Sequence, residues 1–123
     1  MKIREVTDKD IADLLPLLDE LGYPVSFEHF NIRLKRFLQN PGYGVAVCEM
    51  GKQIVGLVAW SKSSLFVSDS TRFHIEGLVV ANGYRSQGIG KRLMEFVEDI
   101  AKKSSPAIID LTSGLRRAKA GSH

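Results

Sequence analysis

One short loop carries the residue types best suited to chemistry in this chain. An apolar extended run precedes it (residues 73–80), and an amphipathic helical pattern follows it (residues 88–103). The first backbone N–H groups of a helix lack intrahelical partners, and the helix dipole adds positive potential there. The loop therefore predicts a phosphate or pyrophosphate cradle made by the N–H groups of residues 87–91, with Arg85 and either Lys91 or Arg92 adding charge. Its sequence is Arg85-Ser86-Gln87-Gly88-Ile89-Gly90.

Two other phosphate-binding motifs fit this loop less well. A dinucleotide fold places Gly-x-Gly-x-x-Gly directly after its first strand, whereas here the spacing is Arg-x-x-Gly-x-Gly and falls late in the chain. A P-loop ends in Gly-Lys-Ser/Thr, but Gly90 is followed by Lys91 and Arg92. The remaining alternative is a plain strand-to-helix turn that uses glycine for its backbone freedom.

Composition narrows the function classes. The 123 residues suit a single domain, and a net charge of +3 suits an anionic ligand but is too weak to indicate nucleic-acid binding. The single Cys48 lies in an alternating strand pattern, which favours a core thiol over a nucleophile. We find no signal peptide or membrane span and no metal-ligand spacing, so we expect a cytoplasmic protein without a metal.

Hydrophobic patterning predicts an α/β fold that positions the loop. We expect strands over residues 2–6, 43–50, 53–60, 72–80 and 107–111, with the third continuing toward Phe66. Helices are expected from Thr7 to Leu21, over 26–38, over 88–103, and from 115 onward. Pro16 predicts a kink or break near Leu15. The strand at 107–111 should run parallel to that at 72–80 through a helical crossover.

The stretch from Ile75 to Leu93, with its Arg-x-x-Gly-x-Gly loop, resembles the GNAT superfamily of acyl-CoA-dependent N-acetyltransferases. The resemblance implies a mixed, mostly antiparallel sheet flanked by helices, in the order βααβββαβ, with residues 1–123 as one acyl-CoA-binding domain. In the family a further helix and two strands follow, so this chain looks C-terminally incomplete. The last strand would then expose an edge that invites pairing with a second copy.

The same resemblance implies acetyl-CoA as the acyl donor. Main-chain groups of Leu78, Val79 and Val80 would hold the pantetheine arm like an added strand, at an opening between residues 78–80 and 109–111. The pyrophosphate would lie on the loop and the first turn of the helix. The residues expected there are Arg85, Ser86, Gln87, Gly88, Ile89, Gly90 and Lys91.

Glu76 is the candidate catalytic residue. It lies on the strand near the expected opening, and some family members use a glutamate around this position as general base. The alternative is a strand carboxylate that only balances charge. The Val80 N–H would polarise the acyl carbonyl. His74 should share the face of Glu76, although a surface or core-edge histidine is favoured over a substrate ligand.

The acceptor is less well defined. Tyr23, Phe27 and Phe30 would line an acceptor pocket or pack in the core. We expect an N-acetyltransferase that acts on a primary amine of a small molecule or protein by direct attack, with no nucleic-acid or membrane partner. The alternative is a CoA-binding module without turnover, because the C-terminal catalytic segment would be absent. Acidic side chains on the first two helices would attract the amine or form a solvated face: Asp19, Glu20 and Glu28.

Overall fold

The computed structural model describes residues 1–111, which form a five-stranded sheet in the order β1-β2-β3-β4-β5. The four strands from β1 to β4 pair antiparallel, and β5 pairs parallel to β4. This arrangement confirms the predicted mixed, mostly antiparallel sheet. The strands are β1 (Lys2–Glu5), β2 (Gly44–Met50), β3 (Gln53–Ser64), β4 (Thr71–Val80) and β5 (Ala107–Leu111).

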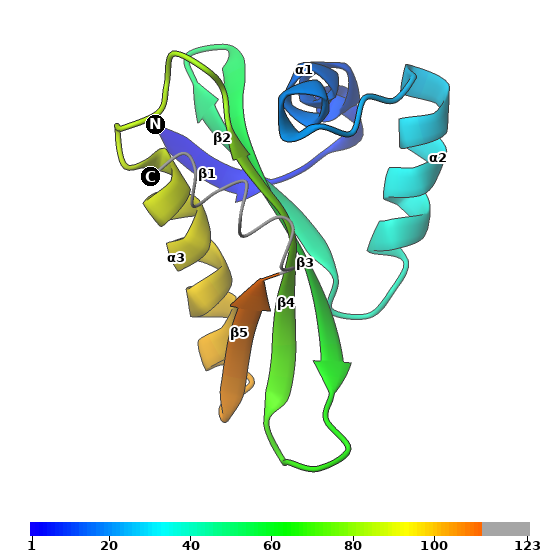
Figure 1. Cartoon of the computed structure of the whole chain (residues 1–123), viewed down its shortest axis with the longest axis vertical. Helices are drawn as coiled ribbons and strands as arrows, with labels where there is room; N and C mark the ends of the chain where they lie inside the picture. The colour runs from blue at the N-terminus through cyan, green and yellow to red at the C-terminus, as the bar shows by residue number, and fades with distance from the viewer. Residues whose placement is uncertain (112–123) are drawn as a thin grey trace.

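Helices cover both faces of the sheet (Figure 1). On one face α1 (Ile11–Leu21) and α2 (Phe27–Leu38) bury leucines and Phe30 against β2 and β3. On the other face α3 (Ile89–Lys102) buries Leu93 and Val97 against β3 and β4. Each helix thus presents one apolar stripe to the sheet, as its sequence periodicity predicts.

A kink or a break is expected near Leu15, and the break is wrong, because α1 runs unbroken through Pro16. Proline removes one backbone donor and crowds the carbonyl four residues earlier, but it does not prevent neighbouring residues from remaining helical. Leu14 and Leu17, on either side of Pro16, are both buried in the core. Their packing against the sheet holds the helix across the proline.

The third predicted strand continues beyond Trp60 toward Phe66, as expected. It ends as β3 at Ser64, and the β3–β4 hairpin projects beyond the body of the sheet (Figure 1). Phe66 and Val67 are exposed at its turn. The helix expected from residue 115 lies outside the described residues. Within residues 1–111, no helix is long and apolar enough to cross a membrane.

A β-bulge interrupts the pairing of β3 with β4. Ala59 pairs with Gly77 and Trp60 pairs with Ile75, so Glu76 is an extra residue without a partner on β3. The extra residue changes the alternation of β4: Ile75 and Leu78, three positions apart, both pack on the α3 side. Bulges of this kind re-aim side chains and recur next to active sites.

A buried carboxylate fastens β1 to the turn that begins α1. Two nitrogens of the Arg4 guanidinium donate to Asp10, each at 2.8 Å, and the Thr7 N–H donates to the same carboxylate at 2.7 Å. Arg4 also donates to Glu49 of β2 at 3.0 Å. The hydrogen bond from Arg4 is the main cause that lowers the pKa of Asp10 below its usual value.

Replacing Asp10 with Asn should destabilise the fold by about 2 kcal/mol at neutral pH, because the buried carboxylate charge that pairs with the Arg4 guanidinium is lost. The depressed pKa of Asp10 means that its contribution is present above about pH 4 and is lost as the pH falls through the folded-state pKa. The difference between wild type and Asp10→Asn should therefore shrink on acidification. Urea unfolding at a series of pH values measures it, and a pH-independent difference would contradict the assignment.

Candidate functional site

The edge of β4 that faces β5 is open over its last residues. Pairing with β5 ends at Ile75 and Leu111, so no described strand covers Leu78 or Val80. The Ala81 N–H donates to the Val55 carbonyl of β3 at 2.8 Å, which fixes the alternation of the antiparallel ladder. By that alternation Val79 directs its backbone groups to β3, whereas Leu78 and Val80 direct theirs to the open edge.

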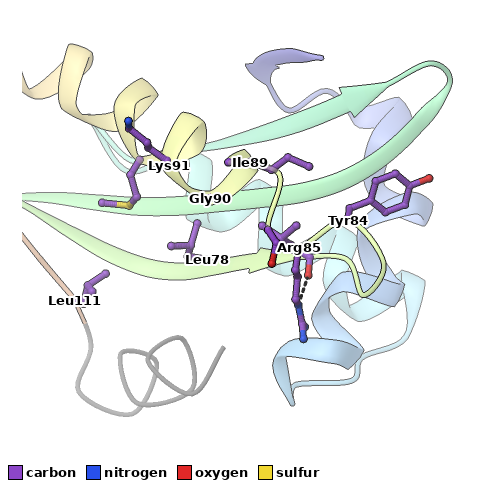
Figure 2. A pocket seen from close by; sticks show the side chains of 11 residues that line it. Leu78, Tyr84, Arg85, Ile89, Gly90, Lys91 and Leu111 are labelled. Carbon is purple, nitrogen blue, oxygen red and sulfur yellow. Dashed lines mark hydrogen bonds between the residues drawn. The ribbon is translucent and has the colours of Figure 1, made fainter. Parts of the chain in front are cut away.

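A cavity of about 590 Å³ lies between this edge and the start of α3 (Figure 2). Its walls include every predicted cofactor residue except Val79 and Gln87. Val79 is buried in the core on the opposite face of the sheet, and Gln87 is exposed away from the lining. The lining residues are Leu78, Val80, Tyr84, Arg85, Ser86, Gly88, Ile89, Gly90, Lys91, Met94 and Leu111.

The opening lies further along β5 than the predicted border at residues 109–111. Ile109, Asp110 and Leu111 all still pair with β4, so the opening begins only beyond the pair of Ile75 with Leu111. Only Leu111, at the end of β5, reaches the cavity from that strand. Figure 2 shows Leu111 and Leu78 on the β-strand side of the cavity, with Gly90 and Lys91 on α3.

The loop before α3 has the backbone shape of an anion cradle. Ser86 and Gly88 adopt positive φ values of 71° and 79°, and Gly88 is the N-cap of α3 without a side-chain capping bond. The helical ladder begins with the Arg92 N–H, which donates to the Gly88 carbonyl at 3.0 Å. Ile89, Gly90 and Lys91 therefore present N–H groups that are not used within the helix.

The two glycines leave room for a ligand at this N-terminus. A Cβ placed on Gly88 would meet no atom within 4 Å, and one on Gly90 would meet only Val80 Cγ2, at 3.9 Å. Packing within the described protein therefore does not require glycine at position 90. Close approach of a bound group to the backbone does explain it, so the residues present fit a pyrophosphate-bearing cofactor.

Arg85 is already engaged within the protein. Its Nε donates to the Val80 carbonyl at 3.1 Å, drawn as a dashed line in Figure 2, and its terminal nitrogen lies 3.5 Å from Glu20 of α1. Glu20 also accepts the Asn82 N–H at 2.8 Å. Arg85 thus ties the loop to β4 and α1, and Glu20 serves this contact rather than an amine.

A second cavity, of about 310 Å³, opens on the other face of β4, below α1 and α2. Its only charged lining residues within the described chain are Glu76 and Arg33. Tyr23, Phe27 and Phe30 were expected to line a pocket or to pack in the core, and Tyr23 and Phe30 do line this cavity. Phe27, Asp19 and Glu28 do not line it. The other lining residues are Leu14, Leu18, Leu21, Leu34, Phe37, Val45, Leu57, Ala59 and Gly77.

The bulged Glu76 is exposed to this second cavity, and a neighbouring hydroxyl holds it. The Ser61 hydroxyl of β3 donates to Glu76 Oε2 at 2.7 Å. Ser61 pairs in register with His74, so His74 and Glu76 lie on the same face of β4, as expected. The carboxylate is therefore fixed on the α1–α2 side of the strand, and Leu78, two residues along β4, faces the first cavity.

His74 is held at the boundary between β4 and β5. Its Nδ1 bonds to Asp110, which also accepts the Arg72 Nε–H at 2.7 Å. The hydrogen bond from Arg72, followed by that from His74, lowers the pKa of Asp110. These contacts fit a core-edge histidine that fastens the parallel pair of strands.

A sequence profile of the acetyltransferase (GNAT) family matches residues 11–117, which is most of the chain. This chain belongs to the GNAT family. It is 26% identical over 119 residues to the uncharacterised N-acetyltransferase YhdJ of Bacillus subtilis, covering 96% of this chain and 83% of that protein. The family assignment explains why a strand, an open edge and a glycine-rich helix start occur together.

Solved structures show the same fold. A GNAT-family acetyltransferase of Staphylococcus aureus shares 28% identity, with a TM-score of 0.83 over 94% of this chain and 87% of that chain. The aminoglycoside N-acetyltransferase AAC(6')-Iy, solved in complex with CoA, shares 17% identity, with a TM-score of 0.81 over 99% of this chain and 83% of that one. At 17% identity, the similarity to the aminoglycoside N-acetyltransferase shows a shared fold and nothing about the acceptor.

Three residues that line the two cavities were not predicted from the sequence: Tyr84, Met94 and Arg33. Tyr84 and Met94 line the first cavity but carry no motif. Arg33 lines the second because the helical turn of α2 places it beside Phe30 and Phe37, three positions before it and four after it. The sequence does contain a signal for the bulge. The apolar residues that face α3 lie at odd positions before it, Phe73 and Ile75, and at even positions after it, Leu78 and Val80. Gly77 marks the change of phase.

Cys48 takes no part in the site. It is completely buried in β2, within the core on the α3 side of the sheet. Burial raises the pKa of its thiol, so the thiolate is disfavoured. The predicted core thiol is confirmed.

Proposed function

We propose that this GNAT-family protein transfers an acetyl group from acetyl-CoA to a primary amine by direct attack. One observation carries the proposal: consecutive residues of β4 line two cavities on opposite faces of the sheet, Glu76 and Gly77 the second cavity and Leu78 the first, where the strand edge is open. A donor on the α3 side and an acceptor on the α1–α2 side would meet there. No covalent intermediate on the protein is needed for such a meeting.

The donor would be held mainly by backbone groups. The free N–H groups of Ile89, Gly90 and Lys91 would bind the pyrophosphate, and Lys91 would add a flexible charge. The pantetheine arm would run along β4 and bond to the outward backbone groups of Leu78, because the Val80 carbonyl already accepts from Arg85 Nε. Because Val79 turns its backbone to β3, we assign it no direct contact with the arm.

The acetyl transfer would proceed in one addition and one elimination. The neutral amine nitrogen attacks the thioester carbonyl carbon, so that a C–N bond forms and the carbonyl electrons move to oxygen. The Val80 N–H, at the open edge, would stabilise that oxygen. The carbonyl then re-forms as the C–S bond breaks, and CoA leaves as a thiolate that takes up a proton from water. Glu76 would accept the proton that the amine loses, directly or through a water.

The proposed function is tested by calorimetric titration of acetyl-CoA and CoA, followed by a thiol-release assay with a panel of amines. We expect acetyl-CoA to bind and an amine-dependent release of CoA, with the acetylated amine confirmed by mass spectrometry. Binding of acetyl-CoA without transfer to any amine would favour a CoA-binding module instead. Failure to bind either compound by a folded chain would overturn the proposal.

A further inference from the structure

The second cavity carries information about the acceptor that the proposed function leaves open. Its volume of about 310 Å³ lies at the lower end of the range typical of small-molecule sites. Apart from Arg33, Glu76 and Tyr23, its lining is aliphatic or aromatic or, at Gly77, without a side chain. A cavity of this kind suits a small molecule with an apolar body rather than a polyhydroxylated one.

The charges of the cavity have opposite signs and come from opposite walls. Glu76 belongs to the bulge of β4, and its Oε1 is free of protein hydrogen bonds within the described residues. Arg33 belongs to α2, and its side chain forms no hydrogen bond or ion pair within residues 1–111. No Asp or Glu lies within four positions of Arg33 along the helix, so its charge is not balanced locally.

We infer that the acceptor is a small primary amine with an apolar body and a carboxylate, which bridges the cavity from Glu76 to Arg33. This inference rests on the proposed function and names its substrate class. The ammonium group would lie at Glu76, where the acetyl group arrives. The carboxylate would pair with the Arg33 guanidinium, whose planar fork matches a carboxylate.

Acceptors with several positive charges fit this cavity poorly. A polycationic aminosugar needs several carboxylates around it, whereas this cavity offers one carboxylate and one guanidinium among its described lining residues. Such a compound would place a further ammonium against Arg33, at a cost from like-charge repulsion. We therefore expect aminoglycosides to be poor acceptors.

The test is a calorimetric comparison of three matched probe series on the whole chain. The probes are ω-amino acids from aminobutanoate to aminooctanoate, alkylamines of the same lengths, and the corresponding diamines. At the best length the amino acid should bind about tenfold more tightly than the alkylamine, as one charge-assisted hydrogen bond at an exposed site allows. The difference should shrink with added salt.

Reversing the charge of Arg33 is the decisive experiment. In Arg33→Glu the preference should reverse, so that the diamine binds more tightly than the amino acid. Arg36→Glu is the matched control, because Arg36 is exposed on the same helix but does not line the cavity, and its preference should stay that of wild type. Equal binding of amino acid and alkylamine by wild type, or an unchanged preference in Arg33→Glu, would overturn the inference.

Separate measurements of binding and of acetyl transfer distinguish the acceptor class inferred here from the proposed reaction. Acetylation of alkylamines without any preference for a carboxylate would leave the proposed function standing and remove the acceptor class. Preferred binding of amino acids without acetyl transfer would support the two-charge site and overturn the proposed reaction.

Discussion

Gly90→Trp should raise the dissociation constant for acetyl-CoA by about 100-fold or more, while the chain keeps its fold. The indole would fill the space in front of the α3 N–H groups, where the loss of two or three charge-assisted hydrogen bonds accounts for such a factor. Gly90 is the better position for this test than Gly88. Gly88 has a φ of 79°, so any side chain there strains the backbone as well.

Two further variants separate blocked binding from damaged structure. Gly90→Ala adds only a Cβ, whose nearest contact is an ordinary 3.9 Å, and alanine favours a helix by about 0.5 kcal/mol or more over glycine. It should be at least as stable as wild type and bind acetyl-CoA more weakly. Glu98→Trp places the same indole on the exposed side of α3 and should change neither property. Wild-type affinity in Gly90→Trp would show that the cofactor lies elsewhere.

Local signals were sufficient to predict the loop and the helix start that line the first cavity. The cradle is a single loop, in which glycine spacing, the preceding strand and the following helix are contiguous in the sequence. The backbone conformation of such a loop is determined mainly by its own residues and little by contacts with distant parts of the chain. The parallel pairing of β5 with β4 followed from the intervening helix, because a parallel connection needs a crossover.

The acceptor side could not be predicted to the same degree, because it depends on register. One extra residue at Glu76 decides which side chains of β4 reach which cavity. Val79 shows the same limit for the backbone: whether its N–H faces β3 or the open edge depends on the ladder, which composition and motif do not specify. Arg85 was expected to hold phosphate, and its contacts with Val80 and Glu20 depend on tertiary packing.

Glu76→Gln should lower kcat for amine acetylation by about 100-fold, with the affinity for acetyl-CoA unchanged. Glutamine keeps the size of the side chain but cannot accept a proton from the amine, and general bases contribute about this factor or more. Glu76 lines the second cavity and not the first, so calorimetric titration of acetyl-CoA serves as the internal control. If the carboxylate only attracts the ammonium group, KM for the amine would rise and kcat would fall little.

The Ser61 hydroxyl allows the same role to be tested without removing the carboxylate. Ser61 is a positioning residue, because its hydroxyl donates to Glu76 Oε2 at 2.7 Å and lies across the bulge on β3. Ser61→Ala should lower kcat about fivefold, the worth of one net hydrogen bond of about 1 kcal/mol. In the Glu76→Gln background the same substitution should have no further effect on kcat, since the group that it orients no longer takes the proton. Additive losses in the double variant would mean that Ser61 acts on the amine or on the fold, and Glu76 would then lose its support as the base.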